Sequence, residues 1–157
     1  MYGKVLVPLD GSELAECVLP HVESIAKGCG AGSVTFVRVA ELVRVPVGAE
    51  DGGFYSAKIW QQMESDSKNA ARQYINQLVK RVKYDGIKVQ SKVLSGGQAA
   101  DMIADYATKN GVDLIVIATH GRSGVSRWVW GSVADKILRS ACVPVLMVRA
   151  PGCECGI

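Results

Sequence analysis

The sequence predicts one α/β domain built around a parallel β-sheet. Strand-like and helix-like patterns alternate without a break from Lys4 to Arg149, as in successive strand–helix–strand units. The run Leu114–Ile117 consists of leucine and β-branched residues between turn signals, which is typical of a strand buried on both faces. A length of 157 residues, with 48% hydrophobic and 21% charged residues, suits a single globular domain.

Hydrophobic periodicity places each element in order. Helices are predicted after Ser12, over Ser56–Tyr84, over Gly97–Asn110 and after Ser132, and Gly111 has the position of a C′ residue. The strand over 87–93 alternates apolar residues with lysine and glutamine, which indicates a position near a sheet edge. The predicted strands cover Lys4–Leu9, Val34–Val39, Ile87–Val93, Leu114–Ile117 and Val143–Val148.

Two helices carry more specific expectations. The first is expected to bury Leu14, Val18, Val22 and Ile25, and to be kinked by Pro20. The long second helix is expected to bury a stripe made of Ile59, Met63, Ala70, Tyr74, Leu78 and Val82.

Segment 40–55, between these two helices, contains proline and several glycines and is expected to be a loop. This loop either covers a ligand or makes a surface excursion.

The segment between the fourth strand and the last helix predicts an anion site. It contains Gly121, Gly124 and Gly131, carries Arg122, and ends at Ser132, which is a favourable N-cap residue type. Glycines let backbone N–H groups approach an anion, and the helix N-terminus that follows favours negative charge. Phosphate is the anion that this pattern best suits.

These residues resemble the nucleotide-binding branch of the universal stress protein family. That branch carries the motif G-x2-G-x9-G-[S/T] after its fourth strand. In this chain Gly121, nine residues and Gly131-Ser132 match the second part of the motif, while Ala118 replaces its first glycine. Alanine is the next smallest residue, so the ligand's close approach is strained rather than blocked.

The resemblance covers nearly the whole chain, from Lys4 to Arg149. The segments Val5–Ser12, Ser132–Leu138 and Val143–Val148 are similar to the family's first strand and turn, its last helix and its last strand. The family implies an open five-stranded sheet of order 3-2-1-4-5 with helices on both faces, the adenine nucleotide alpha-hydrolase-like fold. The first and fourth strands are then neighbours, and a ligand is expected outside their carboxyl ends, at the topological switch point.

The resemblance also implies ATP and a magnesium ion as ligands. Asp10 is expected to contact the ribose or the metal, although Glu13 three residues later also suits a capping box in which Asp10 is the N-cap. The backbone of Val39 is implied to meet adenine. The complete set of implied binding residues is Pro8, Asp10, Val39, Ala118, Thr119, His120, Gly121, Arg122, Ser123, Gly131, Ser132 and Val133.

Several functions lack their sequence patterns. The chain has no Walker A motif, no G-x-G-x-x-G after its first strand, and no serine, cysteine or carboxylate that completes a triad with His120. The favoured function is an ATP-binding universal stress protein that acts as a nucleotide-responsive regulatory module. Two alternatives stay open: a slow ATPase or phosphotransferase, and a protein-interaction module that binds no nucleotide.

Partners and location complete the expectations. A net charge of +3 does not argue for nucleic acid, no apolar run reaches the length of a membrane span, and no signal peptide precedes the first strand. Five cysteines, most of them within regular patterns, suggest a reduced, cytoplasmic protein. The domain is expected over 1–150, followed by a flexible tail over 151–157. Strand 143–148 is apolar and uncharged and lies at the sheet edge in the implied strand order, which predicts a homodimer with Val145 or Met147 at its centre. The family also implies a dimer through this strand.

Overall fold

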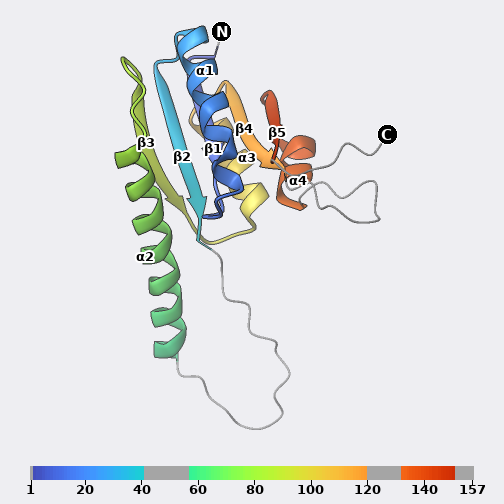
Figure 1. Ribbon diagram of the computed structural model, residues 1–157. Helices are drawn as coiled ribbons and strands as arrows, with labels where there is room; N and C mark the ends of the chain where they lie inside the picture. The colour runs from blue at the N-terminus through green and yellow to red at the C-terminus, as the bar shows by residue number, and fades with distance from the viewer. Residues whose placement is uncertain (1, 41–56, 120–131, 151–157) are drawn as a thin grey trace.

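The computed structural model describes residues 2–40, 57–119 and 132–150 (Figure 1). In these ranges the chain forms one five-stranded sheet of order β3-β2-β1-β4-β5, and every adjacent pair is parallel. The predicted fold and strand order are therefore confirmed. The strands are β1 (Lys4–Pro8), β2 (Ser33–Val39), β3 (Lys88–Leu94), β4 (Leu114–Thr119) and β5 (Val145–Arg149).

Helices cover both faces of this sheet. A short 3₁₀ helix η1 (Ala15–Val18), α1 (Leu19–Cys29) and α2 (Ala57–Arg81) pack on one face, where Phe36 is fully buried. Helices α3 (Ala99–Lys109) and α4 (Ser132–Ser140) pack on the other face through alanines and isoleucines such as Ile103 and Ile137. Each face of the sheet thus has its own apolar core.

The middle of the sheet, formed by β1 and β4, is strongly apolar. Every residue of β4 is buried, and so are Val5 to Pro8 of β1. Side chains alternate across a strand, so a strand covered by helices on both faces needs apolar residues at consecutive positions. The prediction that Leu114–Ile117 is a doubly buried strand is confirmed.

The first helical segment differs from the prediction. It begins as the separate 3₁₀ helix η1, and Leu14 is 47% exposed rather than part of the core. Pro20 lies in the first turn of α1, where the missing N–H costs nothing, so it does not kink the helix. Gly30 ends α1, because it adopts the left-handed conformation with φ 63°.

Helix α2 is longer than the sheet that it covers. Ala71, Ile75 and Leu78 in its second half are buried, whereas Ile59 is 44% and Met63 is 41% exposed. Its 25 residues span about 37 Å, while the seven residues of β2 or β3 span about 23 Å. The first half therefore extends past the carboxyl edge of the sheet (Figure 1). The expected burial of Ile59 and Met63 is wrong for this reason. Ala70 is also exposed, because the buried stripe of the second half runs through its neighbour Ala71 instead.

Two further observations concern membrane-spanning helices and cysteines. Among the helices in the described ranges, none is both long enough and apolar enough to cross a membrane. Cys29 and Cys142 are free thiols. The expected loop over 40–55 and the expected tail over 151–157 lie outside the described residues, apart from Ala40, which is buried.

Candidate functional site

A pocket of about 260 Å³ opens at the carboxyl edge of the sheet. β1 has β2 on one side and β4 on the other, so the chain reverses its direction of winding at this point. Ligands of open α/β sheets bind outside the strand ends at such a switch point. The residues that line the pocket are Pro8, Leu9, Asp10, Ala15, Val37, Arg38, Val39, Ala99, Ile103, Ile117, Ala118, Ser132, Val133 and Ala134.

The pocket brings together residues that are far apart in the sequence. Six of the predicted binding residues line it, from β1 and its turn, from the end of β2, from β4 and from the start of α4. Thr119 is buried at the end of β4, where its carbonyl accepts a hydrogen bond from Ala150 N, and it is not part of the lining. His120, Gly121, Arg122, Ser123 and Gly131 lie outside the described residues. The six in the lining are Pro8, Asp10, Val39, Ala118, Ser132 and Val133.

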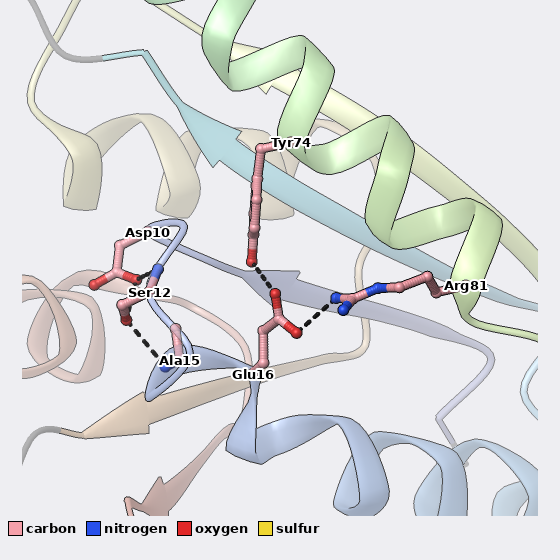
Figure 2. Close-up of polar contacts among 6 residues, drawn as sticks. All are labelled: Asp10, Ser12, Ala15, Glu16, Tyr74 and Arg81. Atoms are coloured by element: carbon pink, nitrogen blue, oxygen red, sulfur yellow. Dashed lines mark hydrogen bonds and ion pairs between the residues drawn. The ribbon is translucent and has the colours of Figure 1, made fainter.

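Asp10 does not cap a helix. Its Oδ1 accepts hydrogen bonds from Ser12 N at 2.9 Å and from Ser12 Oγ at 2.6 Å, as Figure 2 shows. Ser12 Oγ in turn accepts from Ala15 N at 3.1 Å. The capping-box interpretation with Glu13 is therefore wrong: Ser12 supplies the acceptor for the helical turn, and Asp10 closes the tight turn before it. This arrangement fixes the Asp10 carboxylate at the pocket.

The end of β2 presents backbone groups that have no hydrogen-bond partner among the described residues. The ladder between β1 and β2 ends with the hydrogen bond from Leu9 N to Val37 O. In a parallel ladder, alternate residues of a strand face the same neighbouring strand. The next N–H and C=O groups of β2 that face β1 therefore belong to Val39. Within the described part of the chain neither Val39 N nor Val39 O has a hydrogen-bond partner beyond that point. A donor and an acceptor therefore stand next to each other in the pocket wall.

Helix α4 begins at the opposite wall. Ser132 is its first residue and is exposed, and Val133 beside it is 39% exposed. The first turn of a helix has N–H groups without intrahelical partners and carries partial positive charge. Lys136 fixes this helix to α3, because its Nζ donates to Gln98 Oε1 at 2.7 Å and to Asp101 Oδ2 at 2.8 Å. The N–H groups and the partial positive charge at the start of α4 suit a bound anion.

Arg38 is a pocket residue that sequence reasoning missed. Its guanidinium carbon lies 5.5 Å from the centre of the Tyr74 ring on α2. Tyr74 OH donates to Glu16 Oε1 at 3.0 Å, and Arg81 pairs with the other oxygen of Glu16 at 2.6 Å (Figure 2). Burial, followed by the hydrogen bond to Glu16, raises the pKa of Tyr74 far above its ordinary value, so the phenol stays a neutral donor.

The charges in the lining limit the chemistry. Among the described residues of the lining, Asp10 and Arg38 are the ionisable ones, so these residues contribute a single carboxylate. In the ranges that the structure covers, no group of three or more His, Cys, Asp or Glu residues could hold a metal ion. A magnesium site made by protein ligands alone is therefore not built from these residues. One carboxylate is compatible with the common case in which Mg²⁺ takes most of its ligands from phosphates and water.

Curated relatives of this chain share one family name. A protein of Methanocaldococcus jannaschii, universal stress protein MJ0531, is 29% identical over 153 residues, which are 96% of this chain and 84% of the relative. A second protein of that organism, universal stress protein MJ0577, has a solved structure with a TM-score of 0.76. That structure is 25% identical, and the match covers 97% of this chain and 99% of the other.

Two more distant structures share the fold and contain nucleotides. One is a universal stress protein in complex with cAMP, 19% identical, with a TM-score of 0.57 over 95% of this chain and 98% of the other. The other is an Arabidopsis thaliana family member with AMP bound, 16% identical, with a TM-score of 0.62 over 95% and 92%. The sequence model of the universal stress protein family matches residues 1–149. The chain therefore belongs to the universal stress protein family.

Proposed function

We propose that this protein binds an adenine nucleotide, ATP with magnesium, in the pocket at the carboxyl edge of the sheet, and acts as a nucleotide-responsive regulatory module of the cytoplasmic stress response. One observation carries the proposal. Segments at the ends of β1, β2 and β4 and at the start of α4 converge on one pocket, and they supply a carboxylate, free backbone groups and a helix N-terminus. Family members with AMP and cAMP bound support it.

The pocket's two walls suit the two ends of a nucleotide. The adjacent donor and acceptor of Val39 match the acceptor and donor on the edge of adenine. The Asp10 carboxylate is an acceptor for a ribose hydroxyl. The N–H groups of the first turn of α4, from Ser132 and Val133, are donors for phosphate oxygens. The nucleotide is then proposed to extend from β2, across the end of β1, to α4.

Magnesium is proposed to come with the nucleotide. Asp10 would supply one oxygen ligand, directly or through a water molecule, and phosphate oxygens would supply others. The bound ion would offset phosphate charge in a pocket whose described lining has one arginine and one carboxylate. His120, Gly121, Arg122, Ser123 and Gly131 are proposed to complete the phosphate end, as the family motif implies.

The direct test is calorimetry on the purified full chain. Titration with ATP and magnesium should give one site per chain, with a Kd in the micromolar range or below, and mass spectrometry of denatured protein should release adenine nucleotides. Phosphate release measured in the same samples should stay far below a median enzyme rate of about 10 s⁻¹. Absence of binding would favour a protein-interaction module, while turnover near that rate would favour an ATPase.

Asp10→Asn tests the carboxylate. The amide oxygen can still accept the hydrogen bonds from Ser12, so we expect the melting temperature to stay within about 2 °C of the original protein. Loss of the charge should weaken ATP binding about tenfold in the presence of magnesium and less in its absence. An unchanged Kd in titration calorimetry would limit Asp10 to closing the turn.

A homodimer through β5 is part of the proposal. β5 lies at the edge of the sheet and pairs with β4 along one side, so its other side can accept a second chain. Leu146 on this strand is 37% exposed, and Val145 and Met147 are half-buried. Two copies related by a two-fold axis would close both edges.

A further inference from the structure

We propose that Arg38 is a specificity-determining residue that contacts the nucleoside half of the bound nucleotide, an inference that rests on the proposed function. Arg38 lines the pocket and is half-buried. Within the described part of the chain its guanidinium takes part in no hydrogen bond or ion pair, and it contacts the Tyr74 ring. Arg38 is thus a half-buried residue of the pocket lining whose guanidinium has no such partner among the described residues, and such a residue is suited to a ligand that brings acceptors.

The position of Arg38 is fixed from two sides. The Tyr74 ring lies on one side, and Tyr74 itself is held by the hydrogen bond from its OH to Glu16. Gly11 lies on another side with φ 85°, and a Cβ atom there would be 2.8 Å from Arg38 Nη1. The turn therefore favours glycine for its backbone conformation, and a Cβ atom there would also require the end of the Arg38 side chain to shift. A side chain held in this way loses little conformational entropy when it binds.

Strand order decides which half of the nucleotide Arg38 can reach. Arg38 is on β2, whereas the start of α4 lies beyond β4, and β1 separates the two strands. Two strand spacings amount to about 10 Å, so Arg38 stands at the wall opposite the proposed phosphate end. Its neighbour Val39 offers the backbone groups proposed to meet the base. Arg38 is thus placed beside the base and ribose.

The residues at this wall complement one another. The Asp10 carboxylate accepts hydrogen bonds, the Val39 backbone both donates and accepts, and Arg38 only donates. A nucleoside presents ring nitrogens and ribose oxygens as acceptors, which neither Asp10 nor a carbonyl can satisfy. Arg38 supplies that donor, and a charged donor to a neutral acceptor is stronger than a neutral pair.

Calorimetry with Arg38→Met and three ligands tests the proposal. Adenosine, AMP and ATP with magnesium are titrated into the original protein and the variant. We expect the variant to bind each ligand about tenfold more weakly, by the same factor for all three, because the lost contact is to the part that they share. Arg72→Met, which removes an exposed arginine of α2 outside the pocket lining, is the matched control and should leave all three Kd values unchanged.

Arg38→Lys separates charge from geometry. Lysine keeps the positive charge and most of the aliphatic stem but lacks the planar group that lies on Tyr74. We expect a loss of about threefold for each ligand and a melting temperature close to that of the original protein. This variant keeps the test decisive if Arg38→Met folds poorly.

The outcomes distinguish the two proposals. If the original protein binds none of the three ligands, the proposed function fails and this inference fails with it. If the original protein binds but Arg38→Met and Arg38→Lys bind equally well, the inference alone is overturned. A loss that grows from adenosine to AMP to ATP also overturns it, because Arg38 would then contact phosphate. Equal losses for the three ligands support it.

Discussion

Ser132→Asp is expected to lower the affinity for ATP on the order of a hundredfold while leaving the fold intact. Ser132 is the exposed first residue of α4 and lines the pocket. A carboxylate there would stand about 4 Å from a bound phosphate, and like charges at that distance repel by up to about 4 kcal/mol at an effective dielectric constant of 20. Solvent screening reduces this energy, which leaves the hundredfold effect expected here.

The same substitution suits the helix itself. Acidic residues in the first turn of a helix interact favourably with its dipole, by about 0.3–1 kcal/mol. We therefore expect the melting temperature of Ser132→Asp to equal or slightly exceed that of the original protein. Loss of nucleotide binding without loss of stability would show that the substitution acts on the binding site and not on the fold.

The matched control is Ser132→Asn, which has the same size as Asp but no charge. It should bind ATP within about threefold of the original protein, because a neutral side chain does not repel phosphate. Both variants are titrated with ATP and magnesium in low salt and again at about 0.5 M salt, where the penalty in the Asp variant should shrink. Equal affinities of the Asp and Asn variants would place the phosphates away from α4.

Much of the site could be predicted from the sequence, because the topology of the sheet determines which residues lie together at its carboxyl edge. In alternating strand and helix units, every strand ends and every following helix begins at the same edge of the sheet. Residues at strand ends and helix starts, such as Pro8, Val39, Ala118 and Ser132, therefore had to converge. By the same rule Ala99 at the start of α3 lies at this edge, and it lines the pocket as well.

Other features depended on tertiary geometry that periodicity does not record. Arg38 has the pattern of an ordinary strand residue, and neither its place in the pocket lining nor the contact of its guanidinium with Tyr74 of α2 follows from that pattern. Ile59 and Met63 have helical spacing, but the sheet ends before α2 does, so no part of the described core covers them. Asp10 and Ser12 are both good capping residues, and the tight turn at Gly11 assigns that role to Ser12.

Leu146→Asp is expected to convert a dimer into monomers. Leu146 points to the sheet face that carries Val148, but the helices of that face leave it 37% exposed, whereas Val145 and Met147 pack partly into the core of the other face. Among the three, Leu146 is therefore the residue whose substitution changes the edge and spares the interior. In a two-fold interface each copy would bring a carboxylate, and burying unpaired like charges weakens association on the order of a hundredfold or more.

Light scattering after size exclusion, at micromolar concentration, measures this effect. The original protein should elute with twice its chain mass of 16.7 kDa, and Leu146→Asp with a single chain mass. Ile59→Asp is the control, because Ile59 is 44% exposed on α2, which packs at the other edge of the sheet, and it should stay dimeric. A monomeric original protein would contradict the dimer, and a dimeric Leu146→Asp variant would show that the interface lies away from β5.

The pocket lies at the carboxyl edge of the sheet, away from the long side of β5. The monomeric variant should therefore bind ATP with an unchanged Kd. Assembly and nucleotide binding would then be separable properties of one fold.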